Sequence, residues 1–496
     1  MEMLAKVQSI CPQCKKILEA AYVEDGGRVF IEKTCPDHGL FRVPVAEKVD
    51  DYLKWTERPV INIPPPVALT EGEEGRCPLN CGPCQHHLQT TCCVLIDVTQ
   101  RCNQHCPYCF AVAGDGEARE PDLEEMERKF DLLLELGEKE FPYNIQLSGG
   151  EPTVRDDLPE IVSMAKRKGF NYIQLNTNGR RLAEEPGYAE KLKQAGVSVA
   201  FMQFDGVTDD VYLKLRSEPL LEIKKKAIDN CRRAGLAVTL VPTVVRGVNL
   251  DQVGDMVRFL LDNVDVVKGI HFQPVSFFGR HPGGDAETEG RVTMFDVLHA
   301  IEEQTEGFHY EDFCPITTGH TLCCFYSTYL KQGDKVVCQV SSETKQNGAS
   351  CCCTTVDQDP MEIIKKDRNY VVNQWDMGDP VQSPSCCCGG DPEPAEEPCC
   401  CGGDPEPAEE PCCCGGDPEP ETEESCYCGG EEEPMDLDEF IEYYKKNSFT
   451  LTGMAFMDGS NLDAERLKRC RVVQLTDDDK LVPFCAYNSI YRGEEL

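Results

Sequence analysis

The chain has 496 residues, a formal net charge of -38 and 32 cysteines. Such a length can bury a sizeable core over more than one domain. The charge excludes a nucleic-acid backbone as partner, because no basic excess exists to neutralise phosphates. The N-terminus lacks the apolar region of a signal peptide and no apolar run approaches ~20 residues, so we expect a soluble, cytoplasmic protein without a transmembrane segment. In that compartment the cysteines favour metal or redox chemistry over disulfides.

Residues 1–70 are predicted to form a small metal-binding module, in which two alternating apolar runs flank the sequence DGG and indicate a hairpin. The CPQC motif supplies Cys11 and Cys14, and Cys35 adds a third thiol, with His38 three residues further on. Thiolate-rich tetrahedral sites hold zinc or mononuclear iron. The pattern leaves the metal and the fourth ligand open.

A Pro-rich linker, NIPPPVALTEGEEG, leads into the segment 71–93, which carries a second group of cysteines, CPLNCGPCQHHLQTTCC. Residues 94–340 then alternate short β-rich runs, from VLIDV to GIHFQPV, with stretches of helical spacing such as LEEMERKFDLLLEL. Six such alternations predict an α/β fold with a parallel sheet and right-handed crossovers, either an open sheet or a partial barrel. In both arrangements chemistry sits at the carboxyl ends of the strands.

Residues 341–434 form a low-complexity insert, in which CCCGGDPEPAEEP recurs with a period of 13 residues and no basic residue occurs among the repeats. Without bulky apolar residues, and with repeated Pro and Gly, the repeats cannot offset the entropy of ordering, so we expect them to be disordered. Their cysteines either store soft metal ions or belong to a solvated loop expansion. A globular pattern resumes over 435–496.

The sequence VTQRCNQHCPYCFA places Cys102, Cys106 and Cys109 directly after the first predicted strand of the sheet. Three cysteines so close together are more than side-chain packing would explain. They are also one ligand short of the four that a closed tetrahedral metal site needs. A [4Fe–4S] cluster held by three thiolates keeps one iron open to an exogenous ligand, so the spacing favours such a cluster. The alternative is a zinc knuckle that recruits His105.

A second motif follows the next predicted strand, where Gly149, Gly150 and Glu151 stand in IQLSGGEPT. Consecutive glycines let a ligand approach the backbone, and a neighbouring carboxylate can hold a cationic amine. A tight strand-to-helix turn would explain the same residues. Their position one βα unit after the three cysteines favours the functional interpretation.

The two motifs together resemble the radical S-adenosylmethionine (SAM) superfamily, through its CxxxCxxC signature and its GGE motif. The resemblance implies a partial (β/α)6 TIM-type barrel in which SAM chelates the open iron through its amino and carboxylate groups. It also implies a ferredoxin- or flavodoxin-like electron donor and a 5′-deoxyadenosyl radical that abstracts hydrogen from an unactivated carbon. Further SAM contacts are expected at the ends of later strands, where each residue could equally cap a helix. They are Asn176, Thr177, Asn178, Gln203, Asp205 and Arg246.

The order of motifs along nearly the whole chain is similar to a subfamily that contains archaeal tetraether lipid synthases and a 7,8-dihydro-6-hydroxymethylpterin methyltransferase. The resemblance makes the N-terminal module a rubredoxin-like iron site or a zinc ribbon, and it makes two further sets of cysteines ligands of auxiliary [4Fe–4S] clusters. The expected ligands of one auxiliary cluster are Cys77, Cys81, Cys84 and Cys92, with Cys93 as a competing neighbour. Those of another are Cys314, Cys324, Cys470 and Cys485, with Cys323 competing with Cys324.

Three functions follow from the resemblance and from the insert. The first is carbon–carbon coupling of archaeal lipid chains, as in tetraether lipid synthase, with a lipid substrate and peripheral access to a membrane. The second is SAM-dependent methyl transfer to 7,8-dihydro-6-hydroxymethylpterin in methanopterin biosynthesis. The third is a non-catalytic iron- or metal-storage protein that carries a degenerate radical SAM motif.

Overall fold

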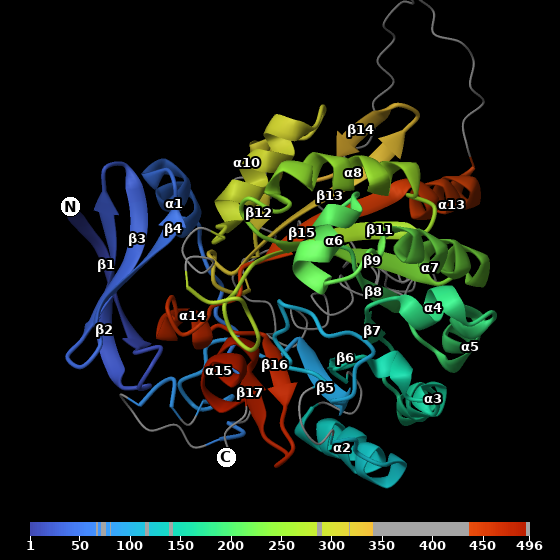
Figure 1. Cartoon of the computed structure of the whole chain (residues 1–496), viewed down its shortest axis with the longest axis horizontal. Coiled ribbons are helices and arrows are strands. Elements are labelled where there is room, and N and C mark those ends of the chain that lie inside the picture. The colour runs from blue at the N-terminus through green and yellow to red at the C-terminus, as the bar shows by residue number, and fades with distance from the viewer. Residues whose placement is uncertain are drawn as a thin grey trace, which may run out of the picture.

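The structure is a computed structural model of the chain (Figure 1). The residues that it describes are 1–65, 68–70, 76–79, 81–114, 119–137, 142–284, 290–316, 318–340 and 436–492. The predicted Cys-rich insert, 341–434, falls outside them. Among the described residues, no helix is both long enough and apolar enough to cross a membrane.

Four antiparallel strands pair in chain order to form an N-terminal sheet: β1 (Glu2–Ile10), β2 (Ile17–Asp25), β3 (Arg28–Cys35) and β4 (Gly39–Ala46). The predicted hairpin is confirmed, since Asp25 pairs with Arg28 across a two-residue turn. Gly26 and Gly27 in this turn have φ angles of 63° and 81°, which are left-handed conformations that favour glycine. Helix α1 (Val49–Thr56) follows and packs against β3 and β4.

The predicted parallel sheet is present, as expected of a partial (β/α)6 barrel. Its strands are β5 (Cys93–Thr99), β6 (Asn144–Gly149), β7 (Ile173–Thr177), β8 (Val199–Gln203), β9 (Ala237–Val241) and β11 (Val267–Pro274), neighbours in that order. The intervening helices lie along the outside of the sheet (Figure 1). They are α2 (Leu123–Leu136), α3 (Leu158–Lys168), α4 (Arg180–Glu184), α5 (Tyr188–Ala195), α6 (Asp209–Arg216), α7 (Leu221–Ala234) and α8 (Val253–Asp262).

Later strands extend both edges of this sheet, which the sequence did not predict. Strand β15 (Ser448–Met454) pairs in parallel with β11, and β13 (Cys324–Gln332) pairs antiparallel with β15. At the opposite edge β16 (Val472–Leu475) pairs in parallel with β5, and β17 (Leu481–Pro483) pairs antiparallel with β16. Because β15 and β16 lie at opposite edges, the link 455–471 passes from one edge to the other and closes the barrel. The remaining elements are β10 (Thr243–Val244), α10 (Met294–Gln304), β12 (Cys314–Pro315), β14 (Lys335–Cys338), α13 (Leu437–Asn447), α14 (Ala464–Leu467) and α15 (Phe484–Ala486).

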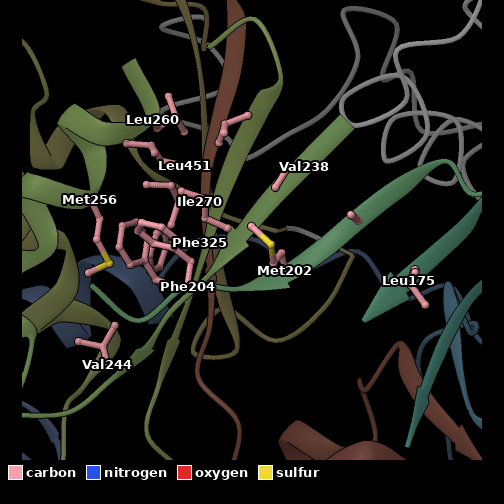
Figure 2. Packing of buried hydrophobic residues seen from close by; sticks show 14 of the residues in the cluster. Leu175, Met202, Phe204, Val238, Val244, Met256, Leu260, Ile270, Phe325 and Leu451 are labelled. Atoms are coloured by element: carbon pink, nitrogen blue, oxygen red, sulfur yellow. The ribbon is translucent and has the colours of Figure 1, made fainter. Parts of the chain in front are cut away.

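A continuous apolar core lies between the outer face of the sheet and the helices. Met202, Val238 and Ile270 project from neighbouring strands into the same cluster as Met256 and Leu260 of α8 (Figure 2). All five are buried. Because side chains alternate along a strand, the other residues of each strand face the barrel interior, where they are free to build a site.

Candidate active site

The interior of the barrel holds a cavity of about 1150 Å³. Its wall is made by the inward-facing residues of the parallel strands, by β13 and β15, and by the closing link 455–471. The thiols on this wall are those of Cys92, Cys93, Cys102, Cys106, Cys109, Cys323, Cys324, Cys470 and Cys485. Cysteines far apart in the sequence therefore face one space.

The loop that carries the predicted cysteine triplet is held by the GGE motif of the next βα unit. The amide of Gly150 donates to Thr99 O (2.7 Å), and the amide of Glu151 donates to Arg101 O (2.9 Å). A Cβ atom on Gly149 would lie 2.2 Å from Thr99 O, and one on Gly150 would lie 2.2 Å from Arg101 O. Only glycine permits this approach, so the motif positions the start of the cysteine loop.

The carboxylate of Glu151 is buried, with 2% of the residue exposed. Its Oε1 accepts hydrogen bonds from N and Oγ1 of Thr153 and from Oγ1 of Thr177 (2.7 Å), and its Oε2 accepts from Asn178 N (2.6 Å). Burial raises the pKa of Glu151, while these donors act against the rise. With three donors on Oε1 and one on Oε2, Glu151 ties β6 to β7 and shapes the turn that a ligand amine would meet.

Two arginines hold the carbonyl groups of the cysteine loop. Arg216 Nη1 donates to Tyr108 O (2.8 Å), and Arg280 Nη1 donates to Cys106 O (3.0 Å). Arg216 also forms a bidentate pair with Asp205, in which the Nε–Oδ2 and Nη2–Oδ1 distances are both 2.8 Å. Both arginines line the cavity, so their charges stand beside the thiols. Sequence reasoning missed these two arginines, because no local motif separates them from other basic residues.

The chemistry of the cysteine triplet fits an iron–sulfur cluster better than a single zinc ion. Burial raises the pKa of Cys102 to about 12 and raises the pKa of Cys106, which the charge of Arg216 lowers in part. Such thiols become thiolates when a metal takes their charge. Ligand atoms around one zinc ion lie within about 4 Å of one another, whereas no three in the described part of this loop lie within 4.8 Å. The spacing does not match the alternative zinc knuckle with His105.

The structure divides the predicted SAM contacts into two groups. Asp205 is fully buried behind the wall, where its carboxylate pairs with Arg216. Arg246 does not reach the wall and pairs with Asp296 (2.7 Å). Both residues thus make ion pairs within the protein. Those that line the cavity are Gly149, Gly150, Glu151, Asn176, Thr177, Asn178 and Gln203.

The first predicted set of auxiliary cysteines has an additional neighbour in the structure. A hydrogen bond with Cys77 raises the pKa of Cys81, and burial and the thiols of Cys470 and Cys84 raise it further. Cys92, predicted as the fourth member, lines the barrel cavity, as Cys470 does. Cys470 was assigned to the second set, so it stands between the two predicted groups.

Three members of the second predicted set lie on the cavity wall, and Cys323 joins them there. Burial, followed by the thiols of Cys470 and Cys323, raises the pKa of Cys485. Arg466 donates from Nε to the Sγ of Cys323 (3.4 Å). Cys314 is buried in β12 and does not reach the wall. The wall thus groups Cys323, rather than Cys314, with the C-terminal thiols.

The N-terminal site is a closed group of four ligands. The ligand atoms of Cys11, Cys14, Cys35 and His38 all lie within 4.8 Å of one another. The Sγ atoms of Cys14 and Cys35 are 3.8 Å apart, and His38 Nδ1 is 3.4 Å from the Sγ atoms of Cys11 and Cys35. Such spacing fits a tetrahedral zinc or mononuclear iron ion. His38 offers the fourth ligand that the sequence left open.

Comparison with known proteins agrees with both sites. Residues 96–260 match the model of the radical SAM superfamily, and residues 3–47 match that of the HMPTM N-terminal zinc ribbon domain. The chain is 35% identical to the 7,8-dihydro-6-hydroxymethylpterin dimethyltransferase of Methanocaldococcus jannaschii, over 99% of this chain and 95% of that protein. It is 34% identical to a probable GTP 3′,8-cyclase of Methanothermobacter thermautotrophicus, over 33% of this chain and 52% of that protein. The crystal structure of Streptococcus suis SuiB bound to S-adenosylmethionine aligns with 44% of this chain and 47% of that one, with 14% identity and a TM-score of 0.36.

Proposed function

Because the chain belongs to the radical SAM superfamily, and within it to the family of the 7,8-dihydro-6-hydroxymethylpterin dimethyltransferase, we propose that it methylates a carbon of a reduced pterin. The observation that carries the proposal is the extent of the similarity, which spans 99% of this chain and 95% of the relative. It therefore includes the closing link 455–471, outside the superfamily match at residues 96–260. That link forms part of the cavity wall, so the likeness extends to groups that a substrate would meet.

The chain's own residues would bind and orient the cofactors at the end of the cavity where β5 and β6 finish. Cys102, Cys106 and Cys109 would hold three irons of a [4Fe–4S] cluster, and the ends of β6 and β7 would meet SAM. When bound, the cluster and SAM supply reductive cleavage of a sulfonium and, with it, removal of a hydrogen atom from an unreactive carbon. Arg216 and Arg280 hold the loop carbonyls, and the charge of Arg216 favours the thiolate form of Cys106.

The thiols of Cys323, Cys324, Cys470 and Cys485 would hold an auxiliary cluster that shares the cavity with the substrate. Burial raises the pKa of Cys470 and that of Cys324 to about 12, which again fits thiols whose charge a metal takes. The ribbon site, through Cys11, Cys14, Cys35 and His38, would hold a separate mononuclear zinc or iron ion.

A second candidate, carbon–carbon coupling of archaeal lipid chains, is favoured by one feature of the wall. Leu95, Phe278 and Phe484 form an apolar cluster against which Phe110 and Phe456 pack. All five line the cavity, and an alkyl chain could lie along them. This candidate needs access from a membrane surface, which the pterin reaction does not.

Anaerobic reconstitution with iron and sulfide, followed by SAM and dithionite, tests the two candidates side by side. With 7,8-dihydro-6-hydroxymethylpterin we expect more 5′-deoxyadenosine and a pterin in which one or two C–H bonds have become C–CH3 bonds, with a second SAM molecule as the donor of each methyl group, measured by mass spectrometry. Coupled chains from an archaeal lipid extract, with the pterin unchanged, would support the second candidate. Iron-loaded protein that releases no 5′-deoxyadenosine with either substrate would favour metal storage.

A further inference from the structure

We propose that four amide side chains inside the barrel, those of Asn144, Gln146, Gln174 and Asn176, recognise the edge of an uncharged nitrogen heterocycle. We call this group the amide wall. The inference rests on the proposed function in one respect, since it assigns the pterin ring of that reaction to particular residues. The contacts that support it would serve any uncharged fused heterocycle with hydrogen-bonding edges.

The amide wall consists of inward-facing residues on two neighbouring strands. Asn144, Gln146 and Ser148 alternate along β6, Gln174 and Asn176 alternate along β7, and all five line the cavity. Gln146 and Gln174 are paired in register across the two strands. Hydrogen-bonding groups therefore recur roughly 5 Å apart across the strands and roughly 7 Å apart along them. That grid has the scale of a two-ring heterocycle.

The amide wall lies deeper in the barrel than the GGE motif. Gln146 precedes Gly149 by three residues, which places it about 10 Å along the strand from the turn that holds the cysteine loop. Asn144 begins β6, at the end opposite to that turn. A cavity of about 1150 Å³ exceeds the volume of most single small-molecule sites. A substrate on the amide wall would thus point toward the SAM contacts and would share only Asn176 with them.

Part of the amide wall is already oriented by hydrogen bonds, and part lacks a partner. Gln174 Nε2 donates to Asn176 Oδ1 (3.3 Å), and Asn176 Nδ2 donates to Ser148 Oγ (3.2 Å). Asn144 is 5% exposed, yet its Nδ2 has no hydrogen-bond partner among the described residues. Buried amide groups are normally paired, because an unpaired one loses hydration without compensation. The Asn144 donor therefore points to a polar ligand in the cavity.

The strands carry no Asp, Glu, Lys or Arg side chain on the cavity wall, within the described part of the chain. The strand histidine on the wall, His271, is neutral near pH 7, since burial lowers its pKa to about 4. Phe201 packs against it, with 5.3 Å between ring centroids, and offers a face on which a flat ring can stack. The charged residues that line the cavity come from loops, the end of a helix and the closing link: Glu151, Arg216, Arg280, Arg469 and Arg471.

This chemistry selects the class of ligand. A charged group on the amide wall would lose its hydration without a counter-charge. An alkyl chain would leave the Asn144 amide unpaired. An uncharged ring edge that alternates donors and acceptors, such as the amino-oxo-pyrimidine ring of a reduced pterin, can pair with amides that offer both.

Anaerobic calorimetric titration of the full-length, cluster-loaded protein with 7,8-dihydro-6-hydroxymethylpterin tests the inference. In Asn144→Leu and Gln146→Leu we expect the Kd for the pterin to rise about fivefold to tenfold, the effect of one neutral hydrogen bond. The matched control is Thr239→Val, because Thr239 Oγ1 is also buried and unpartnered among the described residues but does not line the cavity. If a leucine variant fails to fold, the isosteric variants Asn144→Asp and Gln146→Glu replace it. They put charge on the amide wall, so we expect them to weaken pterin binding by a similar factor.

The outcomes separate this inference from the proposed function. A wild-type protein that methylates the pterin, with variants that bind it as tightly as wild type, would overturn the inference and leave the function standing. A wild type that rejects the pterin but binds guanine or lumazine, with weaker binding in the variants, would overturn the function and support the inference. Binding of none of the three heterocycles would overturn the inference as well.

Discussion

The N-terminal ribbon site and the barrel cysteine site use the same residue type in opposite ways. In the ribbon, Cys11, Cys14, Cys35 and His38 close around one point, with all ligand atoms within 4.8 Å. In the barrel, three thiols share one side of a large cavity, and arginines from distant elements hold their loop. A closed set built by two local turns suits a structural ion, whereas an open set built by long-range contacts suits chemistry. The contrast suits a structural metal site in the ribbon and a reactive metal site in the barrel.

Removing one barrel thiol should abolish the reaction while the ribbon keeps its metal. Cys106→Ala leaves two thiolates for the cluster, so we expect 5′-deoxyadenosine release to fall by at least about three orders of magnitude, as for other catalytic groups. Metal analysis should still find the mononuclear ion. Cys231→Ala is the matched control, because Cys231 is buried on α7 away from the cavity. Loss of the ribbon metal in Cys106→Ala would show that the two sites are not independent.

The long-range support of the barrel loop is tested by Arg216→Met. The substitution leaves the Asp205 carboxylate buried without its cation, and breaking a buried pair in this way costs about 3–5 kcal/mol. We expect urea unfolding to show this loss, together with lower iron content and unchanged ribbon metal. Arg232→Met, which breaks a half-exposed pair with Asp265, should cost less than about 1 kcal/mol. Equal losses in the two variants would refute a special role for Arg216.

The neutral interior of the barrel predicts a dependence of folding stability on pH. Burial lowers the pKa of His271 from 6.5 to about 4, so the folded state binds a proton less readily than the unfolded state. Stability is therefore lost as the pH falls from about 6.5 to about 4, by about 2 kcal/mol between pH 7 and pH 5. In His271→Gln this part of the loss should disappear from urea unfolding curves. An identical pH dependence in wild type and variant would mean that the His271 ring is hydrated.

The smallest effect on SAM cleavage is expected from the ribbon itself. His38→Ala should lower the affinity for the mononuclear ion, while 5′-deoxyadenosine release stays within about twofold of wild type, because no ribbon residue is among the described residues that line the cavity. His38→Cys keeps four ligands and should keep the ion. A large loss of cleavage in His38→Ala but not in His38→Cys would make the ribbon metal part of the reaction.

Local patterns allowed the fold and the cysteine triplet to be predicted, and long-range pairing set the limit. The Gly-Gly turn, the six strand–helix units and the cysteine triplet each depend on a few consecutive residues. The addition of β15 and β16 to opposite edges of the barrel depends on partners hundreds of residues away, so no local signal marked it. Residues 435–496, which were predicted as a separate segment, contribute strands to the same sheet as the barrel.

The same limit applies within the site. Arg216 stands beside the cysteine loop only because α6 ends there, and Asp205 is buried because it pairs with that arginine. Cys323 lies near enough to Cys470 to raise the pKa of its thiol, and spacing between cysteines in the sequence cannot reveal this proximity. Asn144, Gln146 and Gln174 of the amide wall were not predicted, because single Asn and Gln residues in strands carry no motif. Features that depend on the spacing of residues in the sequence were predicted, and features that depend on tertiary contacts were not.

The central claim is that three barrel thiols leave one iron of a cubane open to SAM. The most direct measurement is electron–nuclear double resonance on dithionite-reduced, anaerobically loaded protein with SAM labelled by ¹⁵N at its amino group. A coupling between the cluster and that nitrogen, absent without SAM, is the predicted result. A cluster whose fourth iron shows the signature of a protein ligand both before and after addition of SAM would contradict the claim.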